Sequence, residues 1–248
     1  MRKIAGSFCA LAVLTGCSAP QHDSRSDLTV FAAASLKSTF SDLGAQFEND
    51  HPGTAVTFNF AGSADLVAQL AQGAPADLFA AADATNMAKA VGAGLVTGAP
   101  ADFASNTLTI VTPPGNPRRI ASFADLGTPG TLVVVCAPQV PCGSATEKIE
   151  KATGVTLAPV SEESAVTDVL GKITSGQADA GLVYVTDAAG AGDKVTVVPF
   201  PESVAAVNTY PIATLAAAPS PTAAQQFVEL VTGPRGQQAL SAAGFAAP

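Results

Sequence analysis

The fold of this chain is constrained most strongly by a regular alternation of short apolar runs with amphipathic helical stretches. The strand-like runs are Leu28–Phe31, Ala55–Phe60, Asp77–Ala80, Leu108–Val111, Thr131–Cys136 and Asp179–Val185. Helical stretches follow at about 35–49 and 63–72, from about Ala84, after Gly143, and at 164–175. Strands that alternate with helices form parallel sheets covered by helices on both faces. The sequence therefore predicts the α/β class.

Two turn-rich stretches mark points at which the chain is expected to pass between domains. The first is Thr107–Thr112, which leads into the proline-rich segment Pro113–Pro117, and the second runs from Val195 to Pro211. The simplest arrangement has two lobes, with residues 28–108 and 200–248 in the first and residues 109–199 in the second.

The beginning of the chain has the organisation of a secretory signal. Arg2 and Lys3 precede an apolar run, Ile4–Leu14, that is too short to span a bilayer. The following Leu-Thr-Gly-Cys resembles a bacterial lipobox, in which the cysteine is acylated and becomes the new N-terminus. The alternative is an ordinary signal peptide with a chance cysteine. We expect residues 1–16 to be removed, Cys17 to anchor the protein to the outer face of the cell membrane, and residues 17–27 to form a polar tether.

The charge balance limits the classes of partner. The formal net charge is −8 and 48% of the residues are hydrophobic, so the chain has material for a packed core but lacks the clustered Lys and Arg that nucleic acids require. We expect no nucleic-acid partner, and we expect any bound anion to be held by local donors rather than by a broad positive field. Outside the signal no run has the apolar length of a membrane helix, so membrane contact is expected through the lipid anchor alone.

Two cysteines lie close together in the middle of the chain, Cys136 and Cys142 of Cys-Ala-Pro-Gln-Val-Pro-Cys. In an exported protein the oxidising surroundings favour a disulfide that closes this short loop. Two free buried thiols and a redox pair are the alternatives. The Cys-x5-Cys spacing lacks the Cys-x-x-Cys geometry that tunes a reactive thiolate.

Recognisable catalytic motifs are absent from the sequence. It contains no Gly-x-Ser-x-Gly elbow, no Walker loop, no His-Glu-x-x-His and no paired Cys-x-x-Cys zinc spacing. Of the two histidines, His22 falls in the tether, and His51 precedes Pro-Gly and is expected to be an exposed turn residue. We therefore expect a protein that is not an enzyme and that needs neither a cofactor nor a resident metal.

A serine follows each of the first two strands at the start of a helix. The junctions are Phe-Ala-Ala-Ala-Ser-Leu-Lys, with Ser35, and Phe-Asn-Phe-Ala-Gly-Ser-Ala-Asp-Leu, with Ser63. Each serine fits the N-cap position, and capping alone would explain either one. Neighbouring parallel strands, however, bring helix N-termini together at one sheet edge, where free N–H groups and helix dipoles bind anions. The small residues Ala32–Ala34 and Ala61–Gly62 allow an anion to approach the backbone.

Several segments, in order along nearly the whole chain, are similar to signature segments of periplasmic molybdate-binding proteins. They are Phe31–Leu36, Ala61–Leu66, Gly73–Asp83, Gly181–Ala188 and the tail from Phe227 to Phe245. The resemblance implies a type II periplasmic-binding-protein fold, in which two α/β lobes, each with a parallel-rich sheet, are joined by two hinge crossovers. It also implies capture of molybdate or tungstate by a monomer, with molybdenum present only as the bound oxyanion, and delivery to the permease and ATPase of an ABC importer.

The resemblance also implies which residues meet the oxyanion. Ser35 and Ser63 match the two serines of the first lobe, and the second lobe supplies backbone N–H groups at Cys142 and Val166 and the hydroxyl of Tyr184. The family usually has a small residue such as alanine where this chain has Cys142. Tyr184 has an alternative role as a buried sheet-edge tyrosine whose hydroxyl is satisfied by backbone, and Val166 as plain core packing. Lys37, Arg118 and Arg119 are expected on the surface, because a cation in the cleft would relax selection among anions.

Three alternatives remain open from the sequence. The same fold can serve another solute, such as sulfate or an organic acid, although an organic carboxylate would usually call for an arginine clamp. An anchored hydrolase using Ser35 or Ser63 would need a base within hydrogen-bonding reach, and only His51 is available. A structural or adhesive lipoprotein would bind no small anion.

Overall fold

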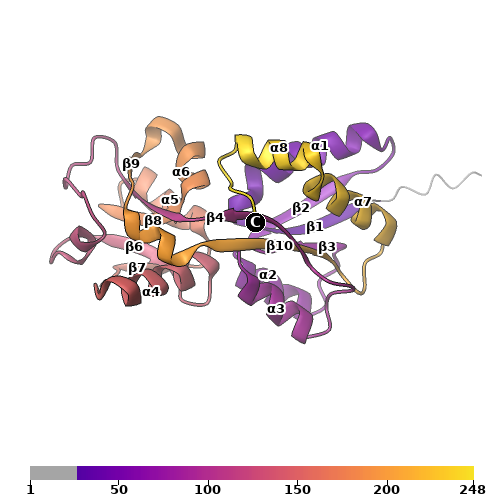
Figure 1. Ribbon diagram of the computed structural model, residues 1–248, viewed down its shortest axis with the longest axis horizontal. Coiled ribbons are helices and arrows are strands. Elements are labelled where there is room, and N and C mark those ends of the chain that lie inside the picture. Colours follow the sequence, from indigo (N-terminus) through magenta and orange to yellow (C-terminus); the bar gives the residue numbers. More distant parts are fainter. Residues whose placement is uncertain (1–26) are drawn as a thin grey trace, which may run out of the picture.

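The computed structural model describes residues 27–248, and the predicted signal peptide, the lipidation site Cys17 and all but the last residue of the tether lie outside that range. Two lobes lie side by side along the long axis of the molecule (Figure 1). Each lobe is built on a five-stranded sheet with helices packed on it. The α/β class and the two-lobed arrangement with parallel-rich sheets are therefore confirmed.

The sheet of the first lobe has the order β2-β1-β3-β10-β4. Strands β1, β2 and β3 are parallel, whereas β10 runs antiparallel to both β3 and β4. The antiparallel strand is the one by which the chain returns from the second lobe. The strands are β1 (Leu28–Ala33), β2 (Val56–Ala61), β3 (Leu78–Ala80), β4 (Ala101–Asn106) and β10 (Asn208–Thr214).

Helices cover both faces of this sheet: α1, α7 and α8 lie on one face and α2 and α3 on the other (Figure 1). Alternate residues of β1 serve the two faces, since Val30 packs in the same apolar cluster as Phe40 of α1, and Phe31 packs with Leu66 of α2. The helices are η1 (Ala34–Leu36, a 3-10 turn), α1 (Lys37–Asp50), α2 (Ser63–Ala71), α3 (Ala84–Gly92), α7 (Pro221–Thr232) and α8 (Pro234–Ala242).

The second lobe repeats the plan with the strand order β7-β6-β8-β5-β9. Its strands are β5 (Leu108–Thr112), β6 (Val133–Cys136), β7 (Ser161–Glu163), β8 (Ala180–Tyr184) and β9 (Thr196–Val198). Its helices are η2 (Ala124–Gly127), α4 (Pro141–Thr153), α5 (Val166–Thr174), α6 (Val185–Ala191) and η3 (Gly192–Lys194).

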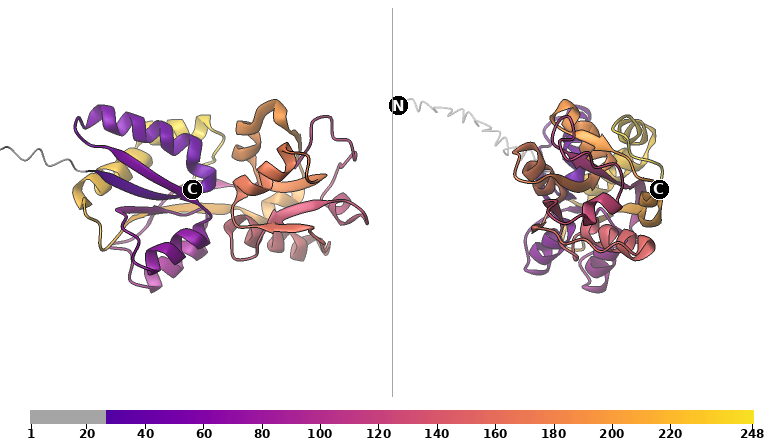
Figure 2. Two further views of the ribbon diagram at one scale, coloured as in Figure 1. Left: turned by 180° about the vertical axis from the view of Figure 1, so that it is seen from behind. Right: turned by 90° about the vertical axis from the view of Figure 1, so that its left-hand side faces the viewer.

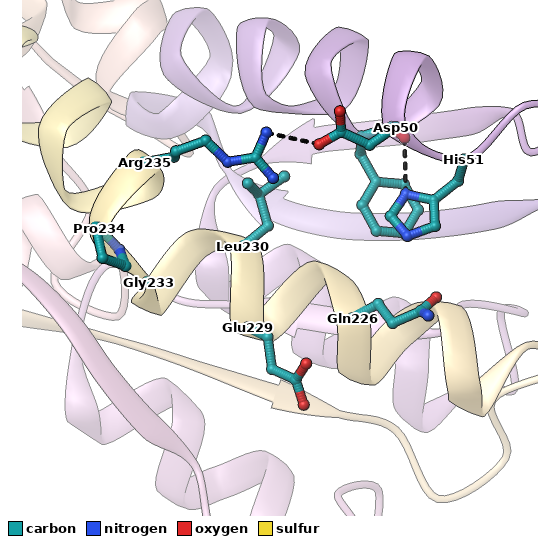
Figure 3. Close-up of a pocket in the computed structure, with 9 residues that line it drawn as sticks. Asp50, His51, Gln226, Glu229, Leu230, Gly233, Pro234 and Arg235 are labelled. Carbon is teal, nitrogen blue, oxygen red and sulfur yellow. Dashed lines mark hydrogen bonds and ion pairs between the residues drawn. The ribbon is translucent and has the colours of Figure 1, made fainter.

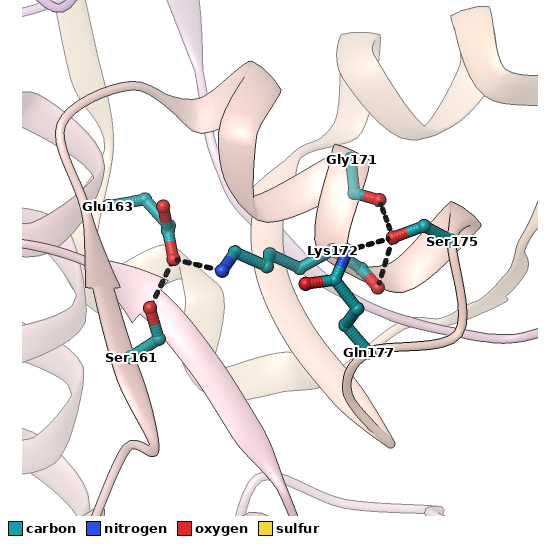
Figure 4. Close-up of polar contacts among 6 residues, drawn as sticks. All are labelled: Ser161, Glu163, Gly171, Lys172, Ser175 and Gln177. Carbon is teal, nitrogen blue, oxygen red and sulfur yellow. Dashed lines mark hydrogen bonds and ion pairs between the residues drawn. The ribbon is translucent and has the colours of Figure 1, made fainter.

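The short strand β7 at the edge of the second sheet is fastened to the following helix by polar contacts (Figure 4). Glu163 accepts a hydrogen bond from the Ser161 hydroxyl and forms an ion pair with Lys172 of α5, with 3.7 Å between Nζ and Oε1. Because α5 begins only three residues after β7, these contacts help to fix the direction in which the start of α5 points.

The chain crosses between the lobes twice. Only Thr107 separates β4 from β5, and the return path from β9 to β10 runs through the 3-10 segment η4 (Pro201–Ala206). The two crossings lie next to each other, since Asn208 pairs with Asn106 (Figure 2). Strands β4, β7, β9 and β10 were not expected from the sequence: β4, β9 and β10 lie within or beside stretches with turn signals, and β7 is a short polar strand of three residues. No helix within residues 27–248 is long and apolar enough to cross a membrane.

Candidate oxyanion-binding site

One small cavity between the lobes is lined by all five residues that the sequence analysis singled out. Its volume is about 10 Å³, roughly the room that one water-sized group needs and well below the roughly 300–1,000 Å³ that is usual for organic ligands. The first lobe contributes Ala33, Ala34, Ser35, Ala61, Gly62, Ser63 and Ala82, and the second contributes Val140, Pro141, Cys142, Val166 and Tyr184. The cavity is therefore too small for a typical organic ligand, and both lobes are needed to form it.

The wall from the first lobe is formed where β1 and β2 end. Ala33 pairs with Ala61 at the end of these parallel strands, so the two junctions that follow, with Ser35 and Ser63, meet at one sheet edge. Ser35 lies within η1 and Ser63 is the first residue of α2. The sequence analysis placed the serine junctions correctly on neighbouring strands.

The N-cap interpretation of the two serines is wrong. Gly62 holds the N-cap position of α2, and neither α2 nor η1 has a side-chain capping hydrogen bond. The hydroxyl of Ser63 instead accepts a hydrogen bond from the backbone N–H of Ala82, at 3.0 Å. Ser35 Oγ lies 3.1 Å from the hydroxyl of Tyr210. Both hydroxyls are thus engaged by tertiary neighbours rather than by their own helices, which the local sequence could not indicate.

The wall from the second lobe is formed by two helix N-termini. Cys142 is the second residue of α4 and Val166 is the first residue of α5. The first N–H groups of a helix have no partner within it, and the helix dipole places partial positive charge there. The side chains of Cys142 and Val166 are buried, and both residues line the cavity.

A disulfide joins Cys136, at the end of β6, to Cys142 in α4. It closes the loop that carries Val140 and Pro141 into the cavity wall. Gly143 allows this loop to turn tightly, because a Cβ atom at that position would lie 2.0 Å from the carbonyl oxygen of Ala137. The disulfide therefore fixes both ends of the loop between Cys136 and Cys142.

Tyr184 closes the site at the end of β8 and is fully buried. Its hydroxyl accepts a hydrogen bond from the side-chain amide of Asn208, at 2.7 Å. Its ring makes an edge-to-face contact with Tyr210, with 5.8 Å between the ring centroids. Burial raises the pKa of Tyr184 well above its ordinary value, and burial also raises the pKa of Tyr210. Both hydroxyls therefore keep their protons at physiological pH and remain available as donors.

The hydrogen bonds behind the cavity show that two of the hydroxyl oxygens act as acceptors. A backbone N–H and an amide N–H can only donate, so Ser63 and Tyr184 must accept from Ala82 and Asn208. Each hydroxyl keeps one proton of its own to donate, and the Tyr184 hydroxyl lies beside both the cavity and the Tyr210 hydroxyl. No lining residue carries a charged side chain. The arrangement offers hydrogen-bond donors without a formal positive charge, which is suited to an anion that has no proton to give.

The lobes are in contact around the cavity. A Cβ atom at Gly62 in the first lobe would lie only 2.0 Å from the carbonyl oxygen of Ser164 in the second. The side-chain amide of Asn86 in α3 also reaches across to the carbonyl oxygen of Gln139, at 3.4 Å. These contacts close the cleft, and a small ion in the cavity would be enclosed from both sides.

The cationic side chains named in the sequence analysis lie on the surface, as expected. Lys37, Arg118 and Arg119 are exposed, and Arg118 is paired with Asp179, at 3.1 Å. Residues 27–248 also contain no group of three or more His, Cys, Asp or Glu side chains that could hold a metal ion. The chemistry of the cavity therefore rests on neutral donors.

A larger cavity of about 470 Å³ lies elsewhere in the first lobe, between the end of α1 and helices α7 and α8 (Figure 3). An ion pair of 2.6 Å between Arg235 and Asp50 occupies one side, so this cation is already neutralised. His51 was expected to be exposed, but it is only partly so: its ring stacks on Phe47 at 4.0 Å and its Nδ1 lies 2.9 Å from the Phe47 carbonyl oxygen. None of the predicted site residues lines this cavity.

Three residues of the site were missed as contributors by the sequence analysis. Ala82 lies two residues after β3 and donates to Ser63, while Asn208 and Tyr210 lie on β10 and contact Tyr184 and Ser35. The only signal for Tyr210 was its position beside a predicted crossover. Asn208 had no signal, because its role depends on a strand whose neighbours come from distant parts of the chain.

Comparison with known proteins shows which family has this architecture. Residues 28–246 match the family model described as bacterial extracellular solute-binding protein. The molybdate-binding protein ModA of Mycobacterium tuberculosis (strain H37Rv) is 55% identical over 92% of this chain and 87% of its own length.

Two solved structures share the fold. The periplasmic molybdate-binding protein of Azotobacter vinelandii superposes with a TM-score of 0.78 at 23% identity, covering 89% of this chain and 99% of the other. The substrate-binding domain of a putative molybdenum ABC transporter from Clostridium difficile superposes with a TM-score of 0.64 at 25% identity, covering 90% and 99%. The resemblance found in the sequence is thereby confirmed, and the chain belongs to the family of bacterial extracellular solute-binding proteins.

Proposed function

We propose that this protein captures molybdate or tungstate between its two lobes and delivers it to an ABC importer. The observation that carries the proposal is the small cavity between the lobes to which Ser35, Ser63, Cys142, Val166 and Tyr184 all contribute. The relative from Mycobacterium tuberculosis, which is 55% identical and is named for molybdate binding, supports the choice of ligand.

A doubly charged tetrahedral oxyanion matches the donors around this cavity. Its four oxygens need several donors arriving from different directions, and the hydroxyls and helix N-termini come from both lobes. Neutral donors also account for anion binding by a chain with a formal net charge of −8. The ligand would act as the bridge that holds the lobes together, because neither lobe alone surrounds it.

The same geometry disfavours anions that still carry a proton. At neutral pH phosphate is partly protonated and must donate a hydrogen bond, which requires an acceptor in the site. Ser63 and Tyr184 already accept from Ala82 and Asn208, and no carboxylate lines the cavity. We therefore expect phosphate to be rejected, and we expect size to separate molybdate and tungstate from the smaller sulfate.

Partners and location complete the proposal. The Clostridium difficile structure is named as the substrate-binding domain of an ABC transporter, which supports a permease and an ATPase as partners. Lipid anchoring at Cys17 and export by residues 1–16 follow from the sequence pattern and complete the picture of a monomeric receptor held at the outer face of the cell membrane.

The alternatives find less support. A different oxyanion such as sulfate requires only a change in fit and remains the second candidate. For a hydrolase, Ser35 and Ser63 have Tyr210 and the Ala82 N–H as partners, while His51 contacts the Phe47 carbonyl at the far end of α1. Neither serine therefore has a histidine base beside it among residues 27–248.

Calorimetric titration of the purified protein tests the proposal. We expect submicromolar binding of molybdate and of tungstate, and no heat with phosphate. Tight sulfate binding without molybdate binding would overturn the ligand assignment. Absence of binding by every oxyanion, together with labelling of Ser35 or Ser63 by a fluorophosphonate, would favour the hydrolase instead.

A further inference from the structure

Asn208 lies directly behind the cavity, at the point where β10 leaves the crossing between the lobes. Its side chain is 3% exposed. The amide nitrogen is within hydrogen-bonding distance of three oxygens: the Tyr184 hydroxyl at 2.7 Å, the Ala82 carbonyl at 3.0 Å and the Pro141 carbonyl at 3.2 Å. Tyr184 and Pro141 belong to the second lobe and Ala82 to the first.

The orientation of the Asn208 amide follows from its partners. The carbonyl oxygens of Ala82 and Pro141 can only accept hydrogen bonds, so the NH2 end of the amide must face them. The nitrogen has two hydrogens for three oxygens, so one hydrogen is shared between two of them. Because an amide nitrogen does not accept, the Tyr184 hydroxyl oxygen is the acceptor in their contact. The single proton of Tyr184 is consequently turned away from Asn208.

We propose that Asn208 is a positioning residue for ligand binding, which directs the Tyr184 proton into the cavity when the lobes close. Ala82 also donates its N–H to Ser63, so the segment that Asn208 holds in the first lobe belongs to the same donor set. Pro141 precedes Cys142, so the contact in the second lobe lies next to the proposed backbone donor. One amide thus connects three parts of the cavity wall. This inference rests on the proposed oxyanion binding.

The composition of the chain supplies a spectroscopic probe of this arrangement. The sequence contains two tyrosines and no tryptophan, and both tyrosines, Tyr184 and Tyr210, lie at or behind the cavity. Near-ultraviolet absorbance therefore reports on these two rings almost alone. A tyrosine hydroxyl that donates to an anion absorbs at longer wavelength, so ligand binding should shift the spectrum in a way that Tyr184→Phe removes.

The test is a double-mutant cycle with sodium molybdate as the titrant. Asn208→Ala is made in the native chain and in the Tyr184→Phe variant, and each protein is first checked for an unchanged folded state by thermal melting. We expect Tyr184→Phe to weaken binding roughly 10- to 100-fold, the range for a hydrogen bond to a charged group. Asn208→Ala should weaken binding about tenfold in the native chain and less than about threefold beside Tyr184→Phe, because its effect passes through Tyr184.

Further variants sharpen the cycle. Asn208→Asp keeps the shape but replaces the donor by an acceptor, so it turns the Tyr184 proton away from the cavity and should abolish the molybdate-induced absorbance shift. Asn208→Ser serves as the test if Asn208→Ala fails to fold, because its hydroxyl is a single donor for which the Ala82 and Pro141 carbonyls compete. Asn86→Ala is the matched control, because Asn86 is likewise a buried amide that reaches across the lobes but does not contact Tyr184. Asn86→Ala should change molybdate affinity by the same factor in the native chain and in the Tyr184→Phe variant.

The outcomes are distinguishable. If the native protein binds molybdate and the Asn208 variants bind equally well with an unchanged absorbance shift, the inference is wrong and the proposed function stands. Equal losses from Asn208→Ala in both backgrounds would also overturn it, since Asn208 would then act independently of Tyr184. If the native protein binds no oxyanion, the proposed function fails and this inference fails with it.

Discussion

Replacing Gly62 by alanine tests whether the lobes close on the ligand as the structure has them. Gly62 is the N-cap residue of α2, with φ −60° and ψ 139°, angles that alanine adopts without strain. The added methyl group is therefore tolerated by the first lobe alone. In the closed form, however, its Cβ atom would lie 2.0 Å from the carbonyl oxygen of Ser164 and 3.2 Å from the carbonyl carbon.

The expected loss of affinity depends on the atom that the new methyl group would clash with, which is a backbone carbonyl oxygen. A Cβ contact below 3.0 Å is essentially never seen, so the two segments must separate by roughly 1 Å, and a backbone carbonyl cannot rotate away as a flexible side chain would. Overpacking of this kind costs about 1–3 kcal/mol, and the upper end applies because the obstacle is backbone. A loss of about 3 kcal/mol in the closed form corresponds to roughly 100-fold weaker binding.

Calorimetry with molybdate measures the loss, and melting without ligand measures the stability of the unliganded protein, which should be unchanged. Gly171→Ala in α5 is the matched control, because a Cβ atom there has no heavy atom within 4 Å and the substitution should leave affinity intact. Unchanged affinity in Gly62→Ala would refute the reasoning, since the contact between Gly62 and Ser164 would then not belong to the bound state.

Three further predictions concern the hydroxyl donors, the disulfide and pH. Ser63→Ala removes a donor to the ligand and leaves the Ala82 N–H without its acceptor, so molybdate binding measured by calorimetry should weaken roughly 10- to 100-fold; a smaller change would mean that Ser63 does not contact the ion. Replacing both Cys136 and Cys142 by serine should lower the free energy of unfolding by about 2 kcal/mol in urea titrations, as expected for so short a loop, while binding persists because Cys142 contributes its backbone; complete loss of binding would contradict this. Burial raises the pKa of Asp187 to about 7, so the folded protein holds this proton more tightly than the unfolded chain and loses stability as pH rises from about 4 to 7. Asp187→Asn should therefore be more stabilising relative to the native protein at about pH 8 than at about pH 5 in urea unfolding, and an equal difference at both would disprove the titration.

The candidate site was predictable where its residues belong to local junctions of strand and helix. Ser35 and Ser63 follow strands whose ends are set by apolar alternation, and Cys142 and Val166 begin helices, so short-range pattern and family resemblance were enough to select them. The pattern could not show what the serine hydroxyls contact. Capping was the simplest local explanation, and it was wrong because the hydroxyls bond to groups that are distant in the chain, the Ala82 N–H and the Tyr210 hydroxyl.

The sequence by itself determined the α/β class, the alternation of strands with helices and the positions of the serine junctions. These features depend on hydrophobic periodicity and on helix signals within a few residues. Only the tertiary structure decided that both lobes meet at one small cavity, that Gly62 lies against Ser164, and that Asn208 joins Tyr184 to Ala82 and Pro141. Such contacts join segments far apart in the chain, and they depend on how the two lobes are placed relative to each other. Hydrogen-bond direction, and with it the preference for an unprotonated anion, exists only once those segments are assembled.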